Sequence, residues 1–68
     1  MESIDRDYLL DLFAKIADAD EWEERRYLQG RIDGHCLQNA IHEEELVALA
    51  AKNGFKVTWT TAMAVVEA

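Results

Sequence analysis

Several features common in small proteins are missing from this 68-residue sequence. It has no proline and a single cysteine, Cys36, so no disulfide can form within the chain. A chain without disulfides fits a reducing compartment. No apolar run approaches the length that spans a membrane, and the opening residues "MESIDRDYLL" are acidic where a signal peptide is positively charged. We therefore expect a cytoplasmic protein with no membrane partner.

Residues that build catalytic and metal sites are also scarce. Ser3 is the only serine, and no glycine-rich phosphate loop is present. His35, Cys36 and His42 do not have the tight spacing of a zinc site. Cys36 is more simply a small core residue and His42 a helix cap. Since so short a chain has little room for a dry pocket with paired carboxylates, we predict no enzymatic activity, no metal and no cofactor.

Basic residues are half as frequent as acidic ones. Seven lysines and arginines stand against 14 aspartates and glutamates, for a net charge of −7. This charge disfavours nucleic acid as a partner. A basic groove on another protein would complement it, although the acids also serve solubility alone. Half of the residues are apolar, so we expect residues 1–68 to form one small folded domain with a marginal core.

Apolar side chains recur at helical spacing near the N-terminus. They predict a helix over residues 4–17, with Ser3 as its cap and acidic residues in its first turn. The stripe consists of Ile4, Tyr8, Leu9, Leu12, Phe13 and Ile16. We expect the last four of these to belong to the core.

A second helix is predicted after a break near residue 19. Asp20 followed by Glu23 resembles a capping box, and Gly30 is a suitable helix stop. The apolar stripe between these positions is thin.

The segment 31–41 has the weakest pattern in the chain. Asp33-Gly34 is a turn signal. We expect residues 35–41 to form no more than a short helical turn, with Leu37 and Ile41 facing inward.

The stretch "EEELVALAAKNGFKVTWT" (residues 43–60) predicts a third helix and its stop. Three leading glutamates and Lys52 suit the two ends of the helix dipole, with His42 as N-cap. Gly54 can adopt the left-handed conformation that ends a helix, and Phe55 would then fold back, as in a Schellman motif. The predicted core residues of this stretch are Leu46, Leu49, Ala50 and Phe55.

The residues after Phe55 fit two structures. Alternation of Val57, Trp59 and Thr61 is typical of a strand, whereas Trp59, Ala62, Met63 and Val66 would share one face of a helix. A lone strand needs a partner, and no second strand is evident. We therefore predict a helix, and an all-α fold: a small bundle of three to four short helices.

Aromatic and arginine side chains form the candidate partner-binding set. Such residues are enriched in the hot spots of protein interfaces. The set consists of Trp22, Arg25, Arg26, Tyr27, Trp59 and Met63. The alternative, that the aromatic side chains fill the core, stays open at this point.

Part of the sequence resembles a known family. The matching residues are Leu9, Leu12 and Phe13, followed by Glu45, Leu46, Val47, Ala48, Leu49, Ala50, Gly54, Phe55 and Thr58. Together they resemble the Nif-eleven-type small proteins and leader peptides, named for nitrogen-fixation gene neighbourhoods. The match covers about half of the chain.

The resemblance implies a helical leader domain that is bound by a peptide-modifying enzyme. In such precursors the enzyme alters residues of a C-terminal core peptide, which usually follows a double-glycine site. This chain has no double glycine and no Cys- or Ser-rich tail, and residues 30–41 look like an insertion. The departures fit a leader without its core or a stand-alone member of the family.

Two classes of function follow from the sequence. The first is a non-catalytic module that recognises another protein, in the manner of a leader domain. The second is a small structural or regulatory subunit that forms a homodimer or docks on a larger complex. An acidic mimic of nucleic acid also fits the charge, but the sequence has no unbroken acidic face.

Overall fold

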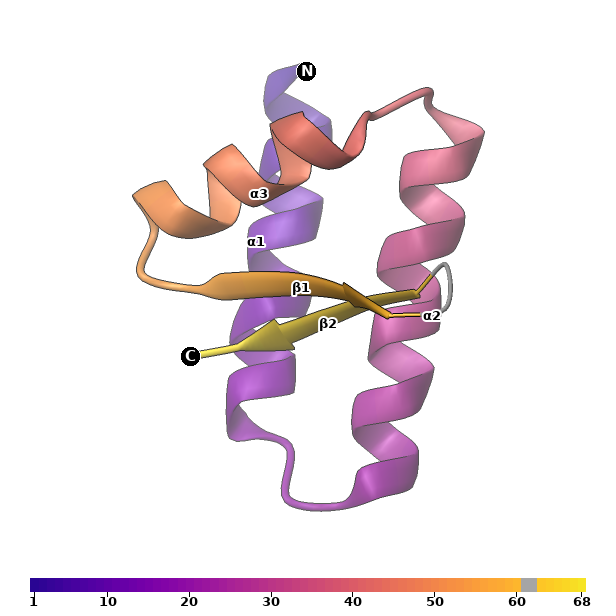
Figure 1. The fold of residues 1–68 in the computed structure, drawn as a ribbon, viewed down its shortest axis with the longest axis vertical. Helices are drawn as coiled ribbons and strands as arrows, with labels where there is room; N and C mark the ends of the chain where they lie inside the picture. Colours follow the sequence, from indigo (N-terminus) through magenta and orange to yellow (C-terminus); the bar gives the residue numbers. More distant parts are fainter. Residues whose placement is uncertain (61–62) are drawn as a thin grey trace.

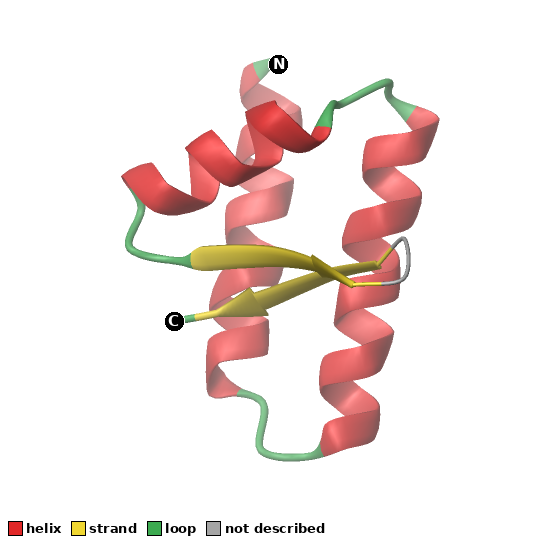
Figure 2. Cartoon of the chain, viewed as in Figure 1, coloured by secondary structure: helices red, strands yellow, loops and turns green. Residues whose placement is uncertain are grey.

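The computed structural model describes residues 1–60 and 63–68, which form helices first and strands last (Figure 2). Within these residues the elements are α1 (Ser3–Asp18), α2 (Trp22–Gln38), α3 (Glu43–Lys52), β1 (Lys56–Thr60) and β2 (Met63–Glu67). The three helices expected before Phe55 are present, but the C-terminal segment forms two strands, which makes the fold α+β and mostly helical.

Two layers make up the molecule (Figure 1). The long helices α1 and α2 lie side by side and antiparallel in one layer, and α3 and the hairpin cross them in the other. β2 contacts both long helices, while β1 contacts α3. The core lies between the layers, so each element buries one face.

The stripe predicted on α1 faces this core. Leu9, Leu12, Phe13 and Ile16 are buried, as are Leu46, Leu49 and Ala50 on α3. Ile4 lies outside the stripe, with 74% of its surface exposed. The helix begins at Ser3 itself with Glu2 as N-cap, so the predicted Ser3 cap is wrong by one residue.

Helix α2 is longer than predicted, because it runs through Gly30 and Gly34 without a break. Its buried stripe of Leu28, Ile32 and Cys36 continues across both glycines at a spacing of four residues. Burying such a stripe outweighs a cost of about 1 kcal/mol for each glycine in a helix. The predicted stop at Gly30 and the predicted turn at Asp33-Gly34 are therefore wrong.

Both α2 and α3 end in Schellman-type turns. After α3, Gly54 has a φ of +83°, and Phe55 donates its N–H to the Ala50 carbonyl at 2.8 Å. This confirms the predicted stop. The half-buried Phe55 ring then packs on Phe13, with 5.5 Å between the centres of the two rings.

The end of α2 uses the same turn with an unusual residue. Ala40 has a φ of +53°, and Ile41 donates its N–H to the Cys36 carbonyl at 2.9 Å. Ile41 is buried as expected, whereas Leu37 is 86% exposed, which contradicts its predicted inward position. A left-handed conformation costs a non-glycine residue about 1–2 kcal/mol.

The predicted C-terminal helix is wrong, because the segment pairs with itself as an antiparallel hairpin. Val57 opposes Val66, and Trp59 opposes Ala64. These four side chains pack on the core side. The partner strand that the sequence pattern did not reveal is residues 63–67 of the same apolar segment, which fold back on residues 56–60. Thr61, which the strand interpretation used, and Ala62, which the helix interpretation used, lie outside the described residues.

The strained end of α2 gives a first prediction. Ala40→Gly is expected to raise the free energy of unfolding by about 1 kcal/mol, because glycine adopts a positive φ without steric cost. Gly54→Ala, the matched opposite change, is expected to lower it by about as much. Urea denaturation of both variants measures this, and a destabilised Ala40→Gly would contradict it.

The core thiol gives a second prediction. Burial, with Asp33 and Glu45 nearby, raises the pKa of Cys36 to about 11. A thiol in the unfolded chain ionises near a pKa of about 8.5. The unfolded state therefore loses its proton first, and the thiol's contribution to stability is lost as the pH rises from about 9 to 11.

Unfolding of the wild type and Cys36→Ala at a series of pH values isolates this effect from tyrosine ionisation. The stability advantage of the wild type should shrink across the alkaline range. A difference that stays constant with pH would refute the prediction.

Candidate recognition surface

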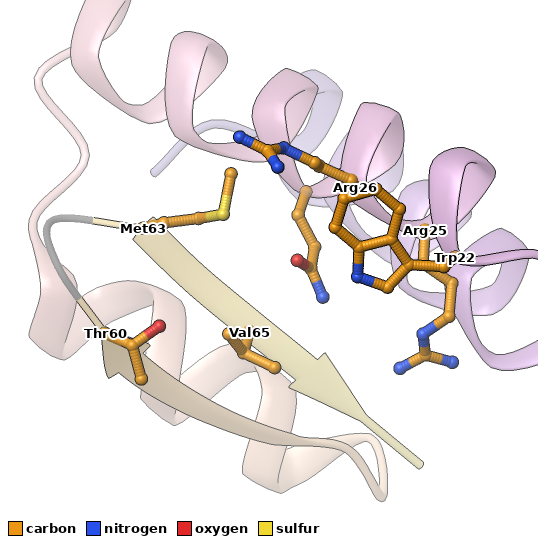
Figure 3. Close-up of a pocket in the computed structure, with 7 residues that line it drawn as sticks. Trp22, Arg25, Arg26, Thr60, Met63 and Val65 are labelled. Carbon is orange, nitrogen blue, oxygen red and sulfur yellow. The ribbon is translucent and has the colours of Figure 1, made fainter.

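A shallow groove lies where the first turns of α2 run beside β2. Its volume is about 540 Å³. We call it the α2–β2 groove, and its lining residues are Trp22, Arg25, Arg26, Gln29, Thr60, Met63 and Val65. Met63 and Val65 on β2 face Trp22 and Arg26 on α2 (Figure 3). Four of the six predicted partner-binding residues thus line one groove.

Trp22 is a solvent-exposed side chain rather than a core residue. It is 68% exposed, and Tyr27 is 63% exposed. The Arg26 guanidinium lies 5.3 Å from the centre of the Trp22 ring, a spacing that residues four apart on a helix allow. The alternative that these two aromatics fill the core is therefore wrong.

A second shallow groove adjoins the first. It is lined by Trp22, Glu23, Arg26, Tyr27, Gly30, Arg31 and Met63. Trp22, Arg26 and Met63 belong to both grooves, so the exposed surface is continuous from β2 to Tyr27.

Arg31 holds two tyrosines together at the far end of this surface. It donates to the Tyr8 hydroxyl from Nε at 3.1 Å and from Nη2 at 2.7 Å, and from Nη1 to the Tyr27 hydroxyl at 3.4 Å. These bonds raise the pKa of the Arg31 guanidinium. Sequence reasoning missed Arg31, although it follows Tyr27 by four residues, as Arg26 follows Trp22.

A further polar contact extends from this cluster toward the N-terminus of α1. His35 Nε2 lies 2.9 Å from Asp5 Oδ1, and its ring is 4.5 Å from the Tyr8 ring. Both members of the His–Asp pair are largely buried. The pair links the start of α1 to the end of α2.

Arg25 has a structural role that its predicted partner-binding role did not include. It donates from Nη1 to the Ile16 carbonyl and from Nη2 to the Val66 carbonyl, each at 3.1 Å. The side chain therefore ties the end of α1 and the strand β2 to α2.

Asp33 makes a similar tie about two turns further along α2. Its Oδ1 accepts the N–H of Ala64 at 3.0 Å. Burial raises the pKa of this carboxyl, and the Ala64 hydrogen bond partly offsets the shift. A buried carboxylate is stabilised only where such donors reach it.

The hydrogen bonds of Arg25 and Asp33 to β2 lie on the edge of this strand that does not pair with β1. Successive pairs in an antiparallel ladder alternate between those that exchange hydrogen bonds and those whose polar groups point away. Since Ala64 donates to Asp33, the Trp59–Ala64 pair is of the second kind, and by alternation so is Val57–Val66. Side chains of α2 thus occupy edge positions where another strand would otherwise pair.

Gln29 lines the α2–β2 groove, whereas Trp59 holds a buried polar group without a partner among the described residues. Gln29 is 8% exposed, lines the α2–β2 groove, and makes no hydrogen bond with a described residue. Trp59 packs against the core, and its buried Nε1 has no partner in the described part of the chain. The structure therefore places Trp59 away from the exposed surface that Trp22 and Met63 share.

No group of three or more histidine, cysteine, aspartate or glutamate side chains in the described residues is placed to hold a metal ion. Among the same residues, none of the helices has the length and apolar character needed to cross a membrane.

The edge tie at Asp33 gives a third prediction. The raised pKa means that the folded state holds this proton more tightly than the unfolded state. The contribution to stability is therefore greatest below about pH 4, and is lost as the pH rises through the folded-state pKa. Asp33→Asn keeps an oxygen acceptor for Ala64 without the charge, so it should abolish this part of the pH dependence.

Asp33→Ala is the matched variant that removes the acceptor. It should be about 1 kcal/mol less stable than Asp33→Asn at neutral pH, because the Ala64 N–H loses its partner. Thermal unfolding between pH 3 and 7 measures both effects. Equal stability of the two variants would show that the hydrogen bond contributes nothing.

Comparisons with protein-family models, curated proteins and solved structures found no match to this chain. The resemblance to the Nif-eleven-type family therefore depends only on the residues quoted above, and what it implies stays a prediction.

Proposed function

We propose that this protein is a non-catalytic recognition module that binds another protein through the α2–β2 groove and the adjoining rings of α2. The observation that carries the proposal is the exposure of Trp22. A tryptophan ring offers a large apolar area, and in so small a protein its burial would contribute to a marginal core. Instead the ring is 68% exposed and in cation–π contact with Arg26.

The neighbours of Trp22 support this function. Tryptophan, tyrosine and arginine dominate interface hot spots, and all three occur on this surface together with Met63. Methionine adapts its shape to a partner. Arg26 and Arg31 lie against aromatic rings, so less rotamer freedom remains to be lost on binding.

A leader-like role is the more specific form of the proposal. The partner would then be a peptide-modifying enzyme, as the resemblance to Nif-eleven-type leaders implies. The Schellman stop at Gly54 and Phe55 supports it, since these residues belong to the resemblance. Residues 56–60 and 63–67 are paired as strands and pack on the helices. We therefore expect any partner to bind the folded domain.

A small subunit that forms a homodimer is the second candidate. The same exposed surface favours it, because a second copy could cover Trp22 and Tyr27. The two candidates differ in whether Trp22 is exposed in the isolated protein in solution.

The fourth prediction distinguishes a recognition module from a homodimeric subunit. Sedimentation equilibrium should show a monomer, with tryptophan emission that contains a component typical of an exposed ring. Trp22→Ala should remove that component and leave the emission of the half-buried Trp59. A dimer that Trp22→Ala dissociates would instead support the second candidate.

A peptide-display selection then tests recognition itself. Peptides that bind the wild type should lose binding to Trp22→Ala by about tenfold or more, as for a hot-spot residue. Leu37→Ala is the control, because Leu37 is an exposed apolar residue outside both grooves. Failure to select any peptide that depends on Trp22 would overturn the proposed function.

A further inference from the structure

We propose that the α2–β2 groove binds an acidic side chain of the partner protein, with apolar neighbours of that side chain packed on Trp22 and Met63. The inference rests on the proposed recognition function and adds the chemistry of the bound segment. It is carried by the charges, the hydrogen-bonding capacity and the shape of the groove.

The groove is a locally basic site on an acidic protein. Its lining contains Arg25 and Arg26 but no aspartate or glutamate. The whole chain has 14 acidic and seven basic residues, so this local excess of positive charge runs against the composition. An acidic ligand group is the natural complement to it.

Arg26 is the group available to hold a carboxylate. Its guanidinium makes no ion pair with a described carboxylate, and it is exposed at the rim of the groove. A cation–π contact with the Trp22 ring keeps the guanidinium at the groove, and its N–H groups donate to no described residue. A planar fork held in this way suits a bidentate bond to a carboxylate. Arg25, already bonded to two carbonyls, adds positive charge without having to move.

Gln29 supplies a second, independent feature of a binding site. It is more than nine-tenths buried, lines the groove, and has no hydrogen-bond partner among the described residues. It follows Arg26 by three residues on α2, so the two side chains are neighbours on the helix surface. Its place on the wall of the groove puts its amide where a bound ligand can reach it. An acidic oxygen would accept from Gln29 and Arg26 together.

The adjoining groove limits the kind of segment that fits. Its lining includes Glu23 beside Tyr27 and Arg31, so a second carboxylate placed there would meet a like charge. We therefore expect a segment with one acidic residue flanked by apolar ones. A run of acidic residues would be repelled by Glu23 and by the net negative charge of the chain.

The fifth prediction concerns the peptides selected by display. Nine-residue random peptides that bind the wild type should be enriched in a single Asp or Glu with apolar neighbours. Synthetic versions should lose about tenfold in affinity when that acid is replaced by its amide, and a similar factor for Arg26→Gln or Gln29→Leu. Arg6→Gln is the charge-matched control, since Arg6 is an exposed arginine of α1 outside both grooves.

Amidated and free-acid forms of each peptide distinguish a side-chain carboxylate from a C-terminal one. Equal affinity of the two forms supports the proposal. Loss of binding on amidation assigns the groove to a chain terminus and overturns it.

Two further outcomes separate this inference from the proposed function. Peptides that depend on Trp22 but not on an acid or Arg26 would overturn the inference and leave the recognition function intact. If no selected peptide depends on Trp22, both fall.

Discussion

The guanidinium of Arg25 joins three elements through two hydrogen bonds to backbone carbonyls. One nitrogen donates to the carbonyl of Ile16 near the end of α1, and another to the carbonyl of Val66 in β2. Both carbonyls are partly buried, where water reaches them poorly. A long side chain that bonds to both therefore fixes the position of the strand. Asp33 fixes the same strand from further along α2. The candidate groove exists because these two residues hold β2 beside the first turns of α2.

Sequence patterns predicted the parts of the fold that depend on local chemistry. The stripe from Leu9 to Ile16 and the stop at Gly54 each need only neighbouring residues, and the structure has both. The predictions were wrong where contacts between residues far apart in the sequence determine the structure. Gly30 looks like a helix end until the stripe of Leu28 and Ile32 is seen to continue across it. The hairpin was missed because its two strands lie within one apolar run.

The candidate site shows the same division. Composition pointed to Trp22, Arg26 and Met63, and the structure brings these side chains to one surface. Composition could not separate Trp22 from Trp59, because exposure depends on which element lies opposite the ring. Gln29 gave no signal at all. A glutamine in a helix is ordinary, and only its place on the wall of the groove beside Arg26 makes it a candidate ligand-binding group.

The groove has one wall from the hairpin and one from α2, and these walls are far apart in sequence. Two hydrogen bonds join these walls. The Asp33–Ala64 bond spans 31 positions of the sequence, and the Arg25–Val66 bond spans 41. If the hairpin separates from the helices, the groove loses one of its two walls. Binding and hairpin docking are then one linked equilibrium, in which the apparent affinity scales with the docked fraction. A change in stability at β2 would alter recognition without touching any residue that meets the partner.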